Sequence, residues 1–262
     1  MKMIKWFFIF CCQTLIFSAY AQFTVVKKSE APLIIKDLFG ADPFGTIYYT
    51  KANNAFVKQA KDTIVTYTNF QLGPIDSANT FNPLKINLFY KDFNMAIILD
   101  NRLAEIYKID FNRLNPYRNV SFVSTGFDNT LWIFNQDLQQ LELYDYKAEN
   151  IRLKTVPIQS EILDLKSDYN YCYLLTKDYL YIYNYFGSLI AQHQNLGYEQ
   201  LALGKANVIL KSDQNLFILP KNEATIAPII MPNLLIKQFL VTNETLYIYD
   251  GVKLHQFQLK KS

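Results

Sequence analysis

The sequence predicts an all-β fold in which six units of short strands follow one another and close into a ring. Three observations predict it. A motif consisting of an Asn, a short apolar strand and an Asp recurs six times. Its period is near 37 residues, the length that four short strands and their turns require. The last unit lacks a strand, while the segment before the first unit has one to spare.

The N-terminal segment has the pattern of a secretion signal. Lys2 and Lys5 come before an apolar run over residues 6–17, and Ala19 and Ala21 form a small-x-small cleavage site. We therefore expect a cleaved signal peptide over residues 1–21 and a single domain over residues 22–262. The mature chain is then periplasmic, outer-membrane-associated or secreted.

Two other interpretations of this segment fit less well. A membrane anchor needs roughly 20 apolar residues, more than the run provides. A lipoprotein needs a small residue before its Cys, whereas Phe10 and Cys11 precede Cys11 and Cys12. We expect no transmembrane segment after the signal is removed.

The charge of the chain is nearly balanced. The formal net charge is +3, and removal of Lys2 and Lys5 from the 26 basic residues leaves 24 against 23 acidic residues, or +1. Such a chain lacks the basic surface that nucleic acids and anionic membranes attract. With only 8 glycines, Asn and Asp are expected to form many tight turns.

The repeat places an Asn before one strand and an Asp before the next. The Asn positions are 54, 94, 129, 170, 207 and 243, and the Asp positions are 62, 100, 137, 178, 213 and 250. The strands between them alternate apolar and polar residues, as strands with two distinct faces do. All six pairs are taken to mark the same two turns of each unit.

The two ends of the domain complement each other. The chain reaches Ser262 just after the third strand of the sixth unit, and residues 23–26 form an extra strand before the first unit. In a closed ring that strand completes the last unit and removes an exposed sheet edge. We therefore predict a closed β-propeller of six four-stranded blades. Five or seven blades and an open stack are the alternatives.

The repeat over residues 23–262 resembles the β-propeller superfamily of WD40-like and quinoprotein-like repeats. The resemblance is one of architecture. The Gly-His and Trp-Asp signatures of WD40 blades are absent, and the two tryptophans are Trp6 and Trp132. The Gly- and Trp-rich docking motif of quinoprotein blades is also absent, so the resemblance implies no bound quinone, and we expect no cofactor.

Two segments are candidates for binding a partner protein. Residues 70–83 form the longest stretch without strand character and contain Phe70 and Phe81; long loops on rigid scaffolds often carry binding residues. Arg113, Tyr117 and Arg118 combine arginine with an aromatic ring, a composition enriched at interface hot spots.

Two tripeptides resemble the O-glycosylation sequence of some exported Gram-negative proteins. They carry Thr63 and Ser77, each preceded by an Asp. Ser77 is the preferred site because residues 70–83 are expected to form a loop.

The sequence shows no catalytic motif. His193 and His255 lie in different units without other ligands at metal-binding spacing, and Cys172 lies in an apolar strand that indicates a buried thiol. The six turn aspartates could form a ring at one end, although their turn role already accounts for them. We predict a non-enzymatic scaffold that binds another envelope or secreted protein. A carbohydrate- or ester-cleaving hydrolase or lyase, with carboxylates in the central channel, is the alternative, and a purely structural surface protein is a third.

Overall fold

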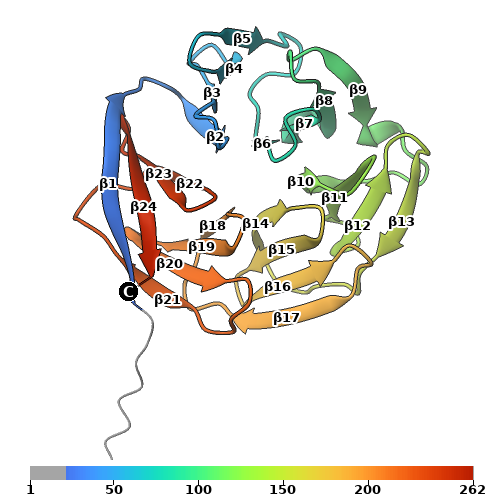
Figure 1. Ribbon diagram of the computed structural model, residues 1–262. Coiled ribbons are helices and arrows are strands. Elements are labelled where there is room, and N and C mark those ends of the chain that lie inside the picture. The colour runs from blue at the N-terminus through green and yellow to red at the C-terminus, as the bar shows by residue number, and fades with distance from the viewer. Residues whose placement is uncertain (1–21, 262) are drawn as a thin grey trace, which may run out of the picture.

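Short strands make up nearly all the regular structure of residues 22–261, the part of the chain that the computed structural model describes. They are grouped around a central axis, and in five of the six groups the strands run in sequence order from an inner strand to an outer strand, while β1 is the outer strand of the sixth (Figure 1). The helices of this part are two single 3₁₀ turns, η1 (Lys91–Phe93) and η2 (Phe111–Arg113). Neither has the length or the apolar character to cross a membrane.

Each group is a four-stranded antiparallel blade. Blade 1 consists of β2 (Asp37–Ala41), β3 (Ile47–Thr50), β4 (Phe56–Gln59) and β5 (Ile64–Tyr67). Blade 2 consists of β6 (Ser77–Asn79), β7 (Ile86–Tyr90), β8 (Met95–Leu99) and β9 (Glu105–Asp110). Blade 3 consists of β10 (Val120–Thr125), β11 (Thr130–Asn135), β12 (Gln140–Asp145) and β13 (Asn150–Lys154).

The second half of the ring repeats this arrangement. Blade 4 consists of β14 (Ile162–Ser167), β15 (Tyr171–Thr176), β16 (Tyr179–Asn184) and β17 (Leu189–Gln194). Blade 5 consists of β18 (Gln200–Leu203), β19 (Asn207–Ser212), β20 (Asn215–Pro220) and β21 (Ala227–Ile230). Blade 6 consists of β22 (Gln238–Thr242), β23 (Thr245–Tyr249), β24 (Lys253–Lys261) and β1 (Phe23–Pro32).

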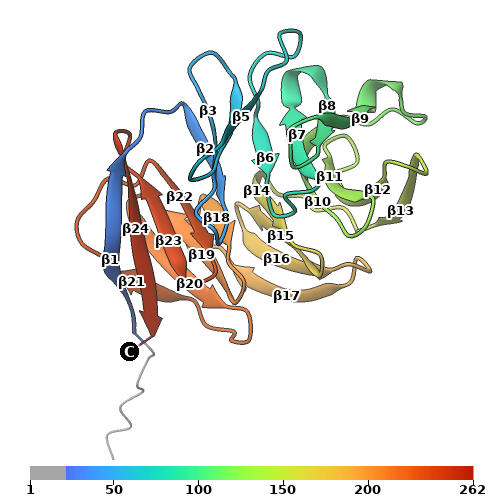
Figure 2. The same ribbon diagram turned by 45° about the horizontal axis from the view of Figure 1, so that its top comes forward.

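The N-terminal strand closes the ring. β1 pairs antiparallel with β24, from Phe23 opposite Lys261 to Pro32 opposite Lys253. The two strands lie side by side in both views (Figure 1, Figure 2). The predicted completion of the last blade by residues 23–26 is therefore confirmed, and β1 is longer than predicted.

The number of hydrogen-bonded sheets differs from the six predicted. Four blades are separate four-stranded sheets, whereas blades 5 and 6 form one eight-stranded sheet. The connection is a short parallel bridge in which Phe23 and Thr24 of β1 lie opposite Ile229 and Ile230 of β21. The outer strands of these two blades thus share hydrogen bonds at the seam where the ring closes.

The core of the described chain lies between neighbouring blades. Six clusters of buried apolar side chains fill the six junctions, and the cluster between blades 6 and 1 joins the end of the chain to its beginning. Buried tyrosines such as Tyr48 and Tyr173 contribute whole rings to these junctions. Cys172 is buried between blades 3 and 4, as predicted, and burial raises the pKa of its thiol.

The predicted register of the repeat is wrong for the first two blades. In blades 3 to 6 the Asn precedes or begins the second strand of the blade, but Asn54 and Asn94 precede β4 and β8, which are third strands. The predicted units therefore begin one strand late in these two blades, at β3 and β7 in place of the inner strands β2 and β6. Asn54, Asn94, Asp213 and Asn243 do adopt the left-handed backbone expected of turn residues.

The two ends of the propeller differ in the turns they carry. Because each blade is antiparallel, the first-to-second and third-to-fourth turns lie at one end, which we call the hairpin face. The second-to-third turns and the connections between blades lie at the other end, the connection face. The inner strands of adjacent blades are neighbours around the whole axis, so each face receives residues from all six blades.

Candidate functional site

The central channel contains a cavity of about 770 Å³, a size typical of small-molecule sites. Its walls are residues of the inner strands β2, β6, β14, β18 and β22. Residues of first-to-second turns, such as Phe44, Tyr169 and Asn243, also line it, so the cavity extends to the hairpin face.

The remaining inner strand, β10, is screened from the cavity by its neighbours. Asn79 of β6 donates to the Ser124 Oγ at 3.0 Å, and the Ser167 Oγ lies 2.7 Å from the same oxygen. Beside these hydrogen bonds, the rings of Phe81 in blade 2 and Tyr169 in blade 4 meet edge to face, with centroids 5.0 Å apart. Blades 2 and 4 thus meet in front of blade 3.

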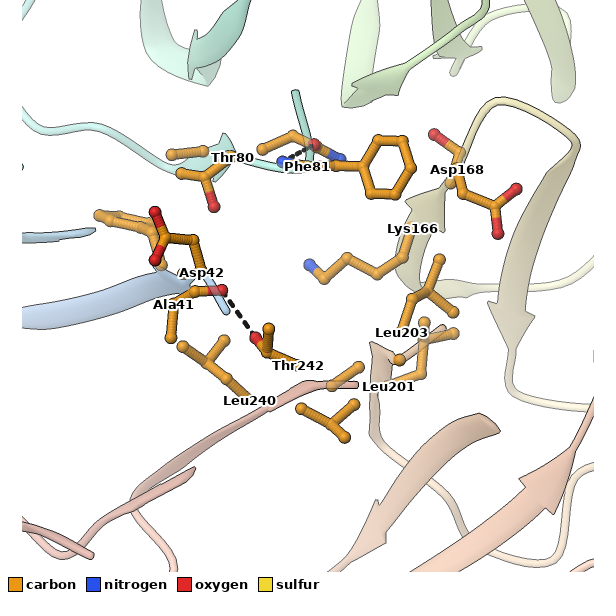
Figure 3. Close-up of a pocket in the computed structure, with 18 of the residues that line it drawn as sticks. Ala41, Asp42, Thr80, Phe81, Lys166, Asp168, Leu201, Leu203, Leu240 and Thr242 are labelled. Atoms are coloured by element: carbon orange, nitrogen blue, oxygen red, sulfur yellow. Dashed lines mark hydrogen bonds between the residues drawn. The ribbon is translucent and has the colours of Figure 1, made fainter. Parts of the chain in front are cut away.

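Strand β14 presents a charged side chain to the cavity at every second residue. The Lys166 Nζ donates to Asp164 Oδ1 at 3.0 Å, and its side chain extends into the open space (Figure 3). Asp168 follows two residues later, where its Oδ2 accepts from Lys221 Nζ at 2.7 Å. The spacing of two residues places all three on one face of the chain.

Apolar side chains form the wall below Lys166. Leu201 and Leu203 of β18 and Leu240 of β22 lie along the same side of the cavity (Figure 3). Leu203 and Leu240 are only partly buried, so they present apolar surface to the cavity. Covering that surface would release water and is favourable.

The wall formed by blades 1 and 2 depends on a glycine. A Cβ atom at Gly40 would lie 1.9 Å from the Thr80 Oγ1, so only glycine allows the turn of blade 2 to approach β2 this closely. The adjacent Ala41 accepts a hydrogen bond from Thr242 of blade 6 at 2.6 Å. These contacts join three blades at the edge of the cavity (Figure 3).

Most of the carboxylate oxygens in the cavity wall already accept hydrogen bonds. Asp164 accepts from the N–H groups of Leu165 and Leu201 as well as from Lys166. Asp168 Oδ1 accepts from the N–H groups of two following residues. Asp42 Oδ1 accepts from the N–H groups of Phe44 and Thr46. These hydrogen bonds hold turns and blade contacts in place.

The structure separates the predicted partner-binding residues. Phe70, Arg113 and Tyr117 lie in connections between blades, on the connection face, and each side chain is exposed. Phe81 lies instead at the channel mouth on the hairpin face. The candidates therefore belong to two different surfaces.

Arg118 is not on the surface. Its Nε donates to Glu142 Oε2 at 2.7 Å, and the two side chains are 7% and 0% exposed. Gln140 donates to the other oxygen of Glu142 at 2.8 Å. Arg118, in the connection that leads into blade 3, thus forms a buried ion pair with Glu142 of β12. The pairing offsets the cost of burying the carboxylate.

Residues 70–83 are not a loop throughout. Ser77–Asn79 form the inner strand β6, and Leu72 and Ile75 are buried in the core. Ser77 therefore lies in the cavity wall, and the loop that favoured it as a glycosylation site is absent there. Thr63 is exposed in the turn between β4 and β5. Glycosylation at either site stays a prediction.

The histidines and the turn aspartates lie outside the channel. His193 is in the outer strand β17, and His255 of β24 bonds Asp250 at 2.7 Å. The turn aspartates are divided between the two faces, since Asp62 and Asp100 occupy third-to-fourth turns and the other four occupy second-to-third turns. Within residues 22–261, no three His, Cys, Asp or Glu side chains are placed to hold a metal ion.

The connection face is rich in exposed apolar residues. Each of the six connections that lead into a blade exposes a large apolar side chain, between 51% and 93% accessible. In order from blade 1 to blade 6 they are Ile34, Phe70, Tyr117, Val156, Leu196 and Leu235. Second-to-third turns add Phe93, Leu138 and Val252. Exposed apolar side chains of this kind mark interaction sites where they form a contiguous patch.

Similar folds occur among solved structures. A streptogramin B lyase structure matches with a TM-score of 0.62 and 10% identity, over 92% of this chain and 88% of that chain. A catalytically inactive histidine-to-alanine variant of virginiamycin B lyase from Staphylococcus aureus, with quinupristin, matches with a TM-score of 0.61 and 11% identity, over 91% and 99%. The chain is a β-propeller.

The propeller fold also occurs in assemblies. A chain of the mitotic checkpoint complex matches with a TM-score of 0.57 and 9% identity, over 89% of this chain and 94% of that chain. No protein-family model and no curated protein sequence matches the propeller. At such low identity, these likenesses establish the fold and leave the function to be argued from the site.

Sequence reasoning did not single out Lys166, Tyr169 or Leu240 as channel residues. One signal for β14 was present, since Asp164, Lys166 and Asp168 alternate with Leu165 and Ser167. That alternation fits a strand with one charged face. The cavity wall itself depends on five blades meeting, and no local pattern encodes that meeting.

Proposed function

We propose that this chain is an exported, non-enzymatic β-propeller that binds a partner protein through its connection face, as a scaffold in an envelope assembly. The observation that carries the proposal is the large apolar side chain exposed by each of the six connections between blades. Phe70, Tyr117 and Leu196 are among them. Aromatic and apolar anchors on a rigid scaffold are what protein interfaces use.

The export part of the proposal rests on the N-terminal sequence. Residues 1–21, which carry the signal pattern, lie outside the described residues. Removal after Ala21 would leave Gln22 as the first residue, directly before the strand that closes the ring. Mass spectrometry of the N-terminal peptide from cells should therefore identify Gln22 as the first residue. A chain that retains Met1 would contradict the proposed cleavage.

The hydrolase or lyase alternative draws on the carboxylates of the channel. An acid or base needs an oxygen that can reach the reacting atom, and both oxygens of Asp164 and Asp168 already accept hydrogen bonds. Asp42 keeps Oδ2 and Asp76 keeps Oδ1 for other partners, and Asp42, at the channel mouth, is the carboxylate to test. Hydrolysis of a sugar or ester that is lost in Asp42→Asn would favour the enzyme alternative.

Site-specific photocrosslinking tests the binding face. A benzophenone amino acid replaces Phe70 or Leu196 in the full-length chain, and cells are irradiated before the tagged protein is purified. We expect a discrete adduct of one size from both positions. Ile190, exposed on the outer strand β17, is the control position and should give none.

A second experiment tests whether formation of the adduct depends on the exposed apolar side chains. With the crosslinker at Leu235, the variant Phe70→Ser/Leu196→Ser should reduce the adduct at least about fivefold, because two anchors are lost. The matched variant Leu189→Ser/Ile190→Ser, on β17, should leave it unchanged. Equal adducts from all positions, or a yield insensitive to Phe70 and Leu196, would rule out this face.

A further inference from the structure

We propose that the central channel is a second, separate binding site, which takes an apolar carboxylate: a ligand with a carboxylate group beside an aliphatic chain. The carboxylate would lie on the ammonium group of Lys166 and the chain on Leu201, Leu203 and Leu240 (Figure 3). This site is distinct from the proposed docking surface, since its walls are the inner strands and the first-to-second turns, whereas that surface is formed by the exposed side chains of the connections between blades.

The first step of the argument is the state of Lys166. An ammonium group has three N–H donors. Among the described residues, the acceptor within hydrogen-bond distance of its Nζ is Asp164 Oδ1, at 3.0 Å. That oxygen is shared with the N–H of Leu165, and the other oxygen accepts from the N–H of Leu201. Lys166 therefore retains donors directed into the cavity.

The second step is the charge that surrounds Lys166. Asp164 and Asp168 are neutralised by Lys166 and Lys221, and the second pair is largely buried, with side chains 16% and 12% exposed. Asp168 also accepts two backbone N–H groups. The carboxylate of a ligand would replace water at Lys166 without displacing these bonds, and charge-assisted hydrogen bonds of this kind are strong.

The third step concerns Asp42 and Asp76, the two lining carboxylates for which the described part of the chain provides no cationic partner. Asp76 is an exposed residue at the start of β6, near the connection face, and accepts from the N–H of Lys91. Asp42, at the hairpin face, is bound through Oδ1 to two backbone N–H groups. Lys205, exposed at the same mouth, adds one positive charge there. The entrance is thus nearly neutral, and it allows an anion to reach Lys166.

The fourth step is the apolar wall. Leu203 and Leu240 are partly exposed to the cavity, and an aliphatic chain placed on them gains the free energy of burying apolar surface on both partners. The rings of Phe81 and Tyr169 add apolar surface at the mouth. The volume of about 770 Å³ exceeds what a chain of ten carbons needs.

A free fatty acid and the C-terminus of an apolar peptide both carry a carboxylate beside an aliphatic chain. The probes are therefore decanoate and acetyl-Leu-Leu with a free C-terminal carboxylate. Their uncharged counterparts are decanol and acetyl-Leu-Leu amide. Titration calorimetry with the mature chain should give a Kd below about 1 mM for at least one carboxylate, and binding at least about tenfold weaker for its uncharged counterpart.

The variant Lys166→Met keeps the length of the side chain and removes its charge. We expect it to weaken binding of the carboxylate about ten- to a hundredfold, while binding of the uncharged counterpart changes less than about threefold. Lys154→Met, on the outer strand β13, is the matched control and should bind as the unaltered chain does. Thermal unfolding of both variants checks that the fold is intact.

Each outcome decides the proposal. Binding of decanoate alone identifies the free acid as the source, and binding of the peptide acid alone identifies a C-terminus. Failure of both carboxylates to bind, or equal affinity in the unaltered chain and Lys166→Met, would overturn the channel site. Neither result bears on the crosslinking at Phe70 and Leu196, so the two proposals fail separately.

Discussion

The ring of Phe81 in blade 2 packs edge to face against the ring of Tyr169 in blade 4, with centroids 5.0 Å apart and planes inclined by 80°. The two blades are not neighbours in the ring, so this pair spans blade 3. Both residues belong to first-to-second turns at the channel mouth. The pair therefore fixes the shape of the mouth as well as the contact between two turns.

Removing either ring should lower the free energy of unfolding only slightly, and the effects of the two substitutions should not be additive. Phe81→Ala and Tyr169→Ala are each expected to lower the free energy of unfolding by about 1 kcal/mol, since both rings are partly exposed. A double-mutant cycle by urea denaturation should give a coupling of about 0.5–1.5 kcal/mol. Additive effects would show that the rings do not interact in solution.

The buried ion pair of blade 3 should be far more sensitive. Glu142→Ala leaves Arg118 buried without its partner, and we expect a loss of about 3–5 kcal/mol in the free energy of unfolding. The paired change Arg118→Met/Glu142→Met should restore a large part of it, because no charge is then left unpaired. Guanidinium denaturation of the three proteins measures both effects. A double variant as unstable as Glu142→Ala would contradict this account.

Acid should destabilise blade 6 at the turn between β23 and β24. Burial raises the pKa of Asp250, but hydrogen bonds from His255 and from the N–H groups of Lys253 and Val252 outweigh it and lower the pKa to about 2. Because this folded-state pKa lies below the ordinary value of 3.8, the carboxylate stabilises the fold above pH 4. That stabilisation is lost as the pH falls from 4 to 2.

The variant Asp250→Asn tests this pH dependence. Its free energy of unfolding should be lower than that of the unaltered chain at pH 5 and should change less between pH 4 and pH 2. Asp137→Asn, in the corresponding turn of blade 3, is the control for substitution in such a turn. Identical pH profiles for Asp250→Asn and the unaltered chain would exclude Asp250 as the titrating group.

Deleting residues 23–27 should destabilise the whole ring. The deletion removes Phe23 from the core between blades 5 and 6, and it removes the parallel bridge to β21 together with half of the pairing with β24. We expect a lower denaturant midpoint. The free energy of unfolding should also depend less steeply on denaturant concentration, because the truncated ring buries less surface. A deletion of Lys260 and Lys261 provides a milder comparison. Unchanged cooperative unfolding after the first deletion would rule out the closure.

A side chain at position 40 should push blades 1 and 2 apart. Gly40→Ala places its Cβ against the Thr80 Oγ1, and the expected loss of stability is about 1–3 kcal/mol. Thr80→Ala removes the obstructing atoms, so the double variant should recover part of the loss. Gly45→Ala, where a Cβ meets open space but the backbone is left-handed, separates backbone strain from crowding.

The sequence predicted the propeller and its closure because both depend on features that recur. Strand alternation and turn residues repeat along the chain, and the spare strand at residues 23–26 matches the strand that the last unit lacks. The register of blades 1 and 2 was mistaken because Asn and Asp suit either kind of turn. The strand β6 has only three residues, too few to show alternation.

The candidate sites were predicted less well than the fold. Phe70, Arg113 and Tyr117 are exposed, as binding residues must be, but Arg118 is buried against Glu142, a residue 24 positions away. Nothing near Arg118 in the sequence indicates that partner. The cavity is even harder to predict from neighbouring residues in the sequence. Lys166, Leu240 and Thr80 come from three blades that meet only when the ring is closed.

The pairing of β1 with β24 also fixes an order of events during synthesis. The first strand of the domain to be made finds no partner before the short bridge to residues 229 and 230, and its main partner, residues 253–261, is made last. Blades 1 to 5 can form earlier from contacts that are close in the sequence, but the sixth cannot. If a chain exported as we propose crosses the membrane before it folds, the seam closes only on the far side.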